Sequence, residues 1–224
     1  MKRTYWVAAL GCAAVLVAGG LFASNMGFKL NYPLEGPGTN GSISGTNALA
    51  LPFNQQTNLA DAEHLINDID ASTGALGTVN QVARFVKSSD STEFYTGSVG
   101  TNFPLTPGEG YFVQVSGDIN YIVVGSHDPT LAIQLDGPGT NGSVSGTNSF
   151  AWPYHGTAAN AEDLIGEVNA AAGSSVVNQV LRWVGSADST EFYTGSVGTN
   201  FSLTPGEFYL VQVSADVSYS PSHY

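Results

Sequence analysis

Fourteen consecutive residues occur twice in this chain without a single change, at 90–103 and again at 188–201. A looser match continues on both sides and includes Leu-Thr-Pro-Gly-Glu at 105–109 and at 203–207. Self-similarity at one spacing, here about a hundred residues, is the sequence signature of a repeated folding unit. The sequence therefore predicts two homologous modules, residues 24–127 and 128–224, joined by a short linker.

The first 23 residues have the layout of a secretory signal peptide. Lys2 and Arg3 precede a mostly apolar run from Tyr5 to Phe22, and the small residues Ala23 and Ser24 follow. We expect an N-terminal signal helix that is cleaved after Ala23. The alternative is an uncleaved anchor, because the run is close to the minimum length of a membrane-spanning helix. In that case the leader is the only expected attachment to a membrane.

Composition narrows the classes of protein that remain. The chain is 42% hydrophobic, which favours a folded protein, and only 11% of its residues are charged. Its net charge is −12, and loss of Lys2 and Arg3 with the leader takes this to −14. Such a field repels phosphate backbones, so we expect no binding to nucleic acid or to anionic membrane surfaces. The lone cysteine, Cys12, lies in the leader, so disulfides and thiol chemistry are not expected in the folded part.

Each module is predicted to be a β-rich α+β unit of about five or six mainly antiparallel strands with one covering helix. Alternating apolar and polar residues predict opening strands at 28–32 and 131–135. Short apolar strands that contain a proline are expected at 48–53 and 150–154. Further strands are expected at 79–86, 94–95, 111–115 and 121–124, and at the matching positions of the second module, which ends in a strand at 218–220.

Each module also contains one helical pattern, at 60–70 and at 161–172. Thr57 or Asn58 is the expected N-cap of the first helix, and Asn160 that of the second. Gly74 and Gly173 are the expected stops.

No pattern in the chain supports an enzyme. Gly-x-Gly-x-x-Gly occurs at 36–41 and 137–142, but a strand follows where a dinucleotide site needs a helix. There is no Gly-x-Ser-x-Gly motif, and the four histidines lack zinc-site spacing. We therefore expect a non-enzymatic protein without a cofactor.

Repeated carboxylates are the remaining candidates for chemistry. Asp90 and Glu93, repeated as Asp188 and Glu191, flank a turn rich in hydroxyl groups. Such oxygens are ligands for calcium, but the block lacks the alternating ligand ladder of a calcium loop, and solvated turn residues are the other interpretation. They would form a glycosidase pair only if the fold brought them together across a cleft.

Aromatic residues are the candidate contacts to a glycan or protein partner. Trp152, Trp183, Tyr95 and Tyr193 stand in or near the repeated turns and strands. Strand alternation requires one residue of each Phe-Tyr pair, 94–95 and 192–193, to face the core.

Arg84 and Arg182 lie next to aromatic residues on matching strands. They are either part of a sugar platform or paired with a nearby carboxylate, with their stems covering apolar surface.

The first strand is a candidate for contacts between copies of the chain. Phe28, Leu30 and Tyr32 share one face of a strand that directly follows the expected cleavage site. Such a strand could pair with the sheet edge of a neighbouring molecule.

Several short runs resemble a group of secreted tandem-repeat proteins that are known from bacterial genomes and have no named activity. The resemblance is carried by Asn25–Leu30, the Gly-Thr-Asn turns, the Leu-Thr-Pro-Gly-Glu runs and the closing Pro221–Tyr224. It covers nearly the whole processed chain and implies bacterial export.

Together these features lead us to expect an acidic protein that is secreted or held at the surface of a bacterium. The first hypothesis is a structural or adhesive protein that assembles with itself into filaments or an extracellular layer. The alternative is a lectin-like module that binds an extracellular glycan or protein.

Overall fold

The computed structural model of the chain describes residues 27–55, 58–126 and 130–222. The expected signal peptide, Thr57 and residues 127–129 of the expected linker 127–130 lie outside the described residues. Within the described residues, no helix has the length and apolar character that a membrane span needs.

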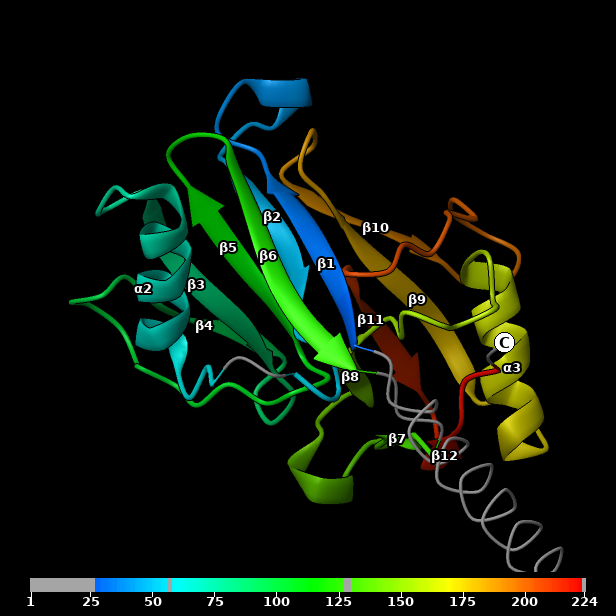
Figure 1. Cartoon of the computed structure of the whole chain (residues 1–224). Helices are drawn as coiled ribbons and strands as arrows, with labels where there is room; N and C mark the ends of the chain where they lie inside the picture. Colours follow the sequence, from blue (N-terminus) through cyan, green and yellow to red (C-terminus); the bar gives the residue numbers. More distant parts are fainter. Residues whose placement is uncertain (1–26, 56–57, 127–129, 223–224) are drawn as a thin grey trace, which may run out of the picture.

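The described residues form two α-helices and twelve strands, and the two halves of the chain repeat one order of elements (Figure 1). The first half contains β1 (Gly27–Leu34), η1 (Thr39–Gly41), β2 (Thr46–Ala50), α2 (Ala62–Thr73), β3 (Val79–Val86), β4 (Ser91–Tyr95), β5 (Gly110–Val115) and β6 (Ile119–Ser126). The second half contains β7 (Ile133–Leu135), η2 (Thr140–Gly142), β8 (Thr147–Ala151), α3 (Ala161–Ala172), β9 (Val177–Val184), β10 (Ser189–Tyr193), β11 (Phe208–Val213) and β12 (Val217–Tyr219). The fold is β-rich, as the sequence predicts.

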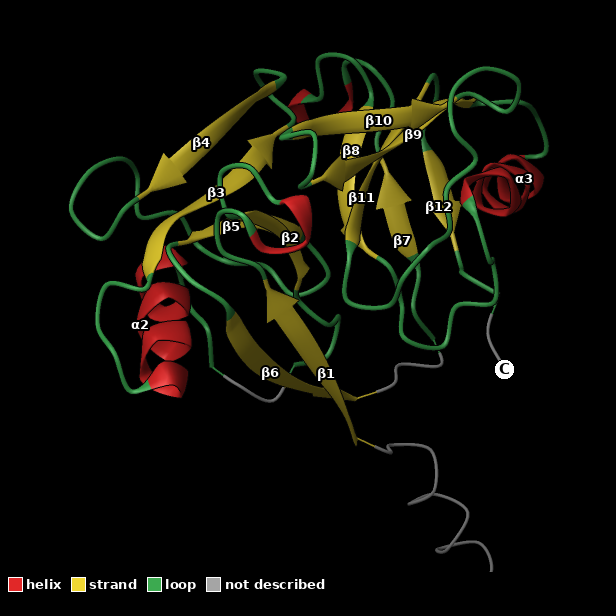
Figure 2. Cartoon of the chain, turned by 90° about the horizontal axis from the view of Figure 1, so that it is seen from above, coloured by secondary structure: helices red, strands yellow, loops and turns green. Residues whose placement is uncertain are grey.

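All four sheets are antiparallel and form two similar pairs. The larger sheets have the strand orders β2-β5-β3-β4 and β8-β11-β9-β10, and the smaller ones are the ribbons β1-β6 and β7-β12. The two helices lie at opposite sides of the molecule with the sheets between them (Figure 2). Each helix packs against its own half, α2 on β3 and β6, and α3 on β9 and β12.

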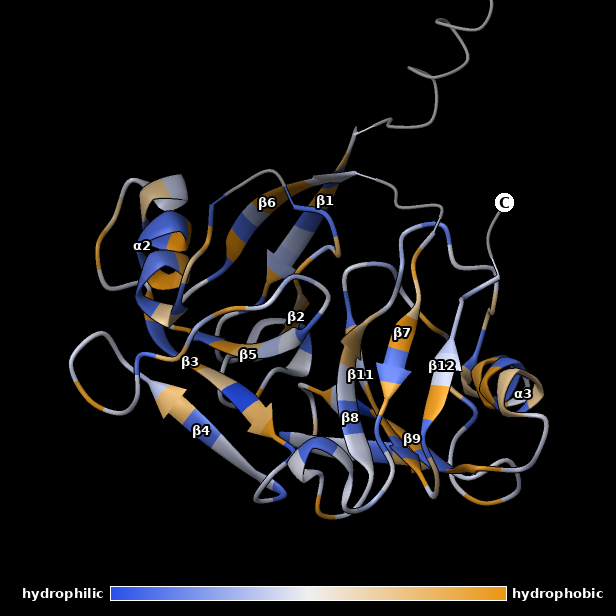
Figure 3. Ribbon diagram, turned by 90° about the horizontal axis from the view of Figure 1, so that it is seen from below, coloured by the Kyte–Doolittle hydropathy of each residue, from blue (hydrophilic) through white to orange (hydrophobic). Residues whose placement is uncertain are grey.

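The core of each half lies between the four-stranded sheet, the ribbon and the helix. In β5, the alternate residues Tyr111, Val113 and Val115 are fully buried on this side of the sheet. The same alternation of apolar and polar residues is visible along β7 (Figure 3). Period-two alternation therefore sets which face of each sheet is covered by the helix.

The capping residues at the helix ends are the predicted ones, with one exception. Asn160 caps α3 by accepting a hydrogen bond from Asp163 N, and Gly74 and Gly173 end the helices in left-handed conformations. The prediction of Thr57 or Asn58 as the first N-cap is wrong. Asp61 caps α2 instead, because its carboxylate accepts the hydrogen bond from His64 N at 3.0 Å.

The strands predicted at 48–53 and 150–154 stop earlier than expected. They are β2 (Thr46–Ala50) and β8 (Thr147–Ala151). Leu51 N and Trp152 N still donate to the carbonyls of Glu109 and Glu207, and the prolines that follow end the pairing. The strand predicted at 28–32 extends over Gly27–Leu34 and pairs with β6 along its whole length. One edge of this strand is thus occupied within the chain.

The two halves contact each other through reciprocal hydrogen bonds. Ala50 N donates to the carbonyl of Gly206 at 2.9 Å, and its counterpart Ala151 N donates to Gly108 at 2.8 Å. A second equivalent pair joins Ile43 N to the carbonyl of Gly185 and Val144 N to that of Lys87. Since each bond has its counterpart from the other half, the contact has approximate two-fold symmetry and closes on itself.

The symmetry breaks where two equivalent positions meet. Phe208 in β11 corresponds to Gly110 in β5, and a Cβ on Gly110 would lie 1.8 Å from Phe208 Cγ. The Phe208 ring instead packs edge-on against Phe112 at 5.0 Å between centroids. The layer between the halves has room for one phenyl ring at this pair of positions.

We expect Gly110→Phe to destabilise the protein by about 3 kcal/mol or more, because two rings would compete for one space. Phe208→Gly should cost about 3–5 kcal/mol, because it leaves a cavity. The double variant Gly110→Phe/Phe208→Gly should be more stable than the Gly110→Phe single variant, since it returns one ring to the layer. Urea unfolding measures these differences, and a double variant as unstable as Gly110→Phe would contradict the two-fold arrangement.

Five tyrosines are buried in the two cores: Tyr32, Tyr111, Tyr121, Tyr209 and Tyr219. Burial raises the pKa of each phenol above its ordinary value, because the charged phenolate is excluded from the apolar interior. Neighbouring carboxylates raise the pKa values of Tyr121 and Tyr219 further, since Asp68 and Glu167 accept hydrogen bonds from their hydroxyls.

The stability that these phenols contribute is present below pH about 10 and should be lost as the pH rises above it, because only the unfolded chain releases the protons there. The free energy of unfolding, measured in urea at pH 7 and at a series of values up to pH about 11, should fall steadily above pH about 10. Tyrosinate absorbance of the folded protein should stay below that of the unfolded chain in the same range. Full ionisation of all tyrosines before unfolding would contradict the burial.

Candidate functional site

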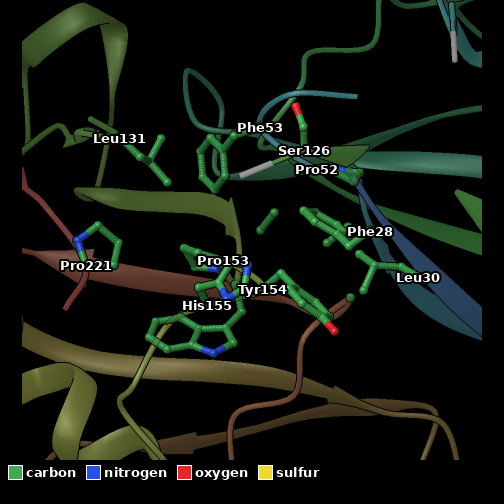
Figure 4. A pocket seen from close by; sticks show the side chains of 14 residues that line it. Phe28, Leu30, Pro52, Phe53, Ser126, Leu131, Pro153, Tyr154, His155 and Pro221 are labelled. Atoms are coloured by element: carbon green, nitrogen blue, oxygen red, sulfur yellow. The ribbon is translucent and has the colours of Figure 1, made fainter. Parts of the chain in front are cut away.

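A pocket opens between the two halves, beside the ends of β2 and β8 (Figure 4). We call it the junction pocket. Its lining consists of Phe28, Leu30, Ala50, Pro52, Phe53, Ser126, Leu131, Ala151, Trp152, Pro153, Tyr154, His155, Gly206 and Pro221.

Equivalent segments of the two halves supply much of this lining. β2 is followed by Pro52-Phe53 and β8 by Pro153-Tyr154, shortly after each strand ends. Proline lacks the N–H that a ladder needs, so the chain leaves the sheet at these points. The aromatic residue after each proline then turns toward the junction (Figure 4).

One wall of the pocket joins the start of the first half to the second half. The ring of Phe28 in β1 stacks on Tyr154, with 4.5 Å between centroids and 8° between the ring planes. The imidazole of His155 packs edge-on against the ring of Tyr154, with 4.9 Å between the centroids. Offset and edge-on contacts of this kind contribute about 0.5–1.5 kcal/mol beyond burial, so they help to hold the wall in place.

The repeated Thr-Pro-Gly-Glu turns bring the halves close enough to form the pocket. Gly206 has φ +95°, and a Cβ there would lie 2.9 Å from the Tyr32 ring; a Cβ on Gly108 would lie 2.3 Å from the Phe53 ring. Both turns therefore require glycine for their conformation and for the close approach.

Each turn is tied to the core of its own half by a buried tyrosine. The Tyr209 hydroxyl accepts from Thr204 N at 2.8 Å and donates to Glu207 at 2.9 Å. Burial raises the pKa of the Glu207 carboxyl, while the hydrogen bond from Tyr209 opposes this. Tyr111 binds Thr106 and Glu109 in the same way. The glutamates thus help to orient both turns, and the second turn contributes Gly206 to the lining of the pocket.

The pocket is narrow and uncharged. Its cavity volume is about 50 Å³. None of the described residues that line it is Asp, Glu, Lys or Arg. Its polar side-chain atoms belong to Ser126, Trp152, Tyr154 and His155. Such a lining suits a small, uncharged, apolar ligand.

The structure brings together three of the residues that the sequence singled out as partner contacts. Phe28, Leu30 and Trp152 all line the junction pocket. Tyr32 does not line the pocket; it is buried, and its hydroxyl donates to the carbonyl of Ala50.

The other aromatic candidates lie elsewhere. Tyr95 and Tyr193 pack against the cores of their own halves, while their neighbours Phe94 and Phe192 are exposed. Trp183 lies between the halves, where its Nε1 donates to the carbonyl of Thr46 at 2.9 Å and its ring meets Phe112. Its indole is therefore a structural contact rather than an open platform.

The four calcium candidates are engaged within the protein. Asp90 and Asp188 accept hydrogen bonds from hydroxyls of the opposite half, Ser145 at 2.9 Å and Ser44 at 2.5 Å. Glu93 and Glu191 accept from the arginines of the adjacent strands, at 2.6 and 2.5 Å. Across residues 27–55, 58–126 and 130–222, no three His, Cys, Asp or Glu side chains come together as metal ligands would.

The two arginines that bind these glutamates pair with carboxylates and do not form a sugar platform. Arg84 pairs with Glu93 and lies over the ring of Phe103, 4.8 Å from its centroid. Arg182 repeats the arrangement with Glu191 and Phe201. The stems and guanidinium groups thus cover core aromatics instead of presenting a sugar platform.

Sequence reasoning missed Phe53, Tyr154 and the two prolines before them. The available signal was the Pro-aromatic pair that occurs at matching positions of both halves. Both pairs fall within the strands predicted at 48–53 and 150–154, because an apolar run that continues past the end of a strand has the same pattern as the strand itself.

Comparison of the chain with protein-family models, with curated proteins and with solved structures finds no match.

Calcium should not stabilise the protein, because the four candidate carboxylates are already engaged by hydroxyls and arginines. A calcium site with a dissociation constant of about 0.1 mM would add about 2.7 kcal/mol at a calcium concentration of about 10 mM. Thermal unfolding of the mature protein with calcium and with EDTA should give the same midpoint, and a calcium-dependent rise would contradict this assignment.

Proposed function

We propose that the chain is an exported, non-catalytic binding protein that holds a small, uncharged, apolar ligand in the junction pocket. In this proposal it is a fused pair of homologous modules, each with one helix over its sheets. The observation that carries the proposal is the convergence of aromatic side chains from both halves on one narrow pocket with an uncharged lining. Pockets of this kind, at the boundary between two folded units, are the usual place for small-molecule ligands.

The shape and chemistry of the lining support one ligand class. Ring faces and proline edges surround a space too narrow for a large ring system. A charged ligand would lose its hydration without gaining an opposite charge. The favoured ligand is therefore a single aromatic or alicyclic ring, or a short alkyl chain, with at most one polar group for Ser126 or His155.

The reciprocal contact between the halves argues against assembly of further copies through the same surface, and so favours a ligand-binding function. Each half covers the surface that the other would offer to a further copy. An interface that closes on itself does not continue into a filament. Assembly of copies would have to use other surfaces.

Export is part of the proposal. It rests on the signal-peptide layout of the leader and on the resemblance to secreted bacterial repeat proteins. A protein with net charge −14 after cleavage is also well suited to remain soluble outside the cell or at its surface.

Toluene and cyclohexanol are suitable probes for the pocket. We expect both to bind the mature protein with a dissociation constant on the order of 0.1–1 mM, as measured by saturation-transfer NMR. Leu131→Trp should weaken binding at least about tenfold, because the larger ring fills space at the rim of the pocket.

Leu76→Trp is the matched control, because Leu76 is 92% exposed and does not line the pocket. Binding to this variant should equal binding to the unaltered protein. Equal binding by the Leu131→Trp variant, or no binding of either probe to the unaltered protein, would refute the proposed function.

A further inference from the structure

β4 and β10 are the outermost strands of their sheets, and each pairs with a neighbour on one edge only. The outer edge of such a strand presents backbone N–H and C=O groups that can pair with another chain. Both strands have the sequence Ser-Thr-Glu-Phe-Tyr, so one molecule carries the same edge twice.

A loop of the repeated block folds back over each of these edges. In the first half, Thr101 N donates to the carbonyl of Phe94 at 3.0 Å, and Thr96 N donates to Val99 at 3.0 Å. In the second half, Thr199 N donates to Phe192 at the same distance. The loops 96–101 and 194–199, which we call the edge loops, thus occupy an outward-pointing carbonyl of each strand.

One glycine in each loop permits this fold-back. Gly100 has φ +94°, and a Cβ there would lie 2.0 Å from the Phe94 carbonyl oxygen. Gly198 has the same φ, and its Cβ would lie 2.0 Å from the Phe192 carbonyl oxygen. Gly97 and Gly195 also have positive φ, but nothing lies within 4 Å of a Cβ at either. The close approach to the strand thus depends on Gly100 and Gly198.

The covered edges are suited to a second copy of this chain. If two β4 strands pair antiparallel about Glu93, Thr92 of each copy lies opposite Phe94 of the other. Phe94 and Phe192 are 44% and 42% exposed, so their rings are available for such a contact. The only charge on each strand, Glu93 or Glu191, is already paired with an arginine of its own sheet.

We propose that the edge loops are caps, and that the outer edges of β4 and β10 are latent docking surfaces for further copies of this chain. With the caps in place, the strand edges of different molecules do not pair. With the caps displaced, the two identical edges of each molecule pair with those of its neighbours and form an open chain of molecules.

The test uses the double variant Gly100→Ala/Gly198→Ala of the mature protein in sedimentation equilibrium. We expect its weight-average mass to rise on the order of twofold or more and to keep rising with concentration, because each molecule has two edges. The matched control Gly97→Ala/Gly195→Ala should remain monomeric, because it strains the same loops without striking the strands. Adding Thr92→Lys and Thr190→Lys to the uncapped variant should restore the monomer, since a charge on the edge opposes pairing.

A folded Gly100→Ala/Gly198→Ala variant that stays monomeric overturns the proposal. Equal association of the control variant also overturns it, because loosening of the loops would then suffice. Hydrogen exchange of the unaltered protein supplies a check that needs no variant. The Thr101 and Thr199 amides should be protected, and exchange as fast as in an unfolded peptide would show that the caps are not formed.

Discussion

The close approach of the two halves at the Thr-Pro-Gly-Glu turns is the constraint on which the rest of the structure depends. Each turn receives a backbone hydrogen bond from the strand of the opposite half, Ala50 to Gly206 and Ala151 to Gly108. Glycine is required at both positions, because a Cβ on Gly206 would strike the Tyr32 ring of the opposite half and a Cβ on Gly108 would strike the Phe53 ring of its own half. The junction pocket lies where these strands and turns meet, and the residues that follow β2 and β8 supply much of its lining.

A nearly symmetric contact forces the two halves to differ where they touch. Gly110 and Phe208 occupy equivalent positions, and only one ring fits between them. Lys87 forms an ion pair with Asp136 across the junction, whereas the residue equivalent to Lys87 is Gly185. The junction pocket has a lining that neither half could form alone, because residues of both halves contribute to it.

Local sequence patterns predict the helices and strands, but not which of them contact one another across the two halves. The second helix was predicted at 161–172 and lies there, because its cap and apolar spacing are local signals. The sequence makes Trp183 a candidate partner contact but does not show its structural contact, because Thr46, to which its indole donates, is 137 residues away in the chain. The sequence predicts strand for the residues after β2 and β8 because their apolar runs continue those of the strands. Apolar character shows that a side chain is covered, but not which part of the chain covers it.

The unchanged block of fourteen residues follows from the same internal demands in both halves. Asp90 reaches the opposite half, and Glu93 pairs with Arg84. Asn102 accepts a hydrogen bond from Glu63 N at the start of α2, and Asn200 repeats this at α3. Gly100 lets the loop close over the strand edge. A block in which so many positions have a structural partner needs no catalytic role to explain its sequence. Phe94 and Val99 are the exception, because both are exposed apolar residues that lie beside the edge the loop covers.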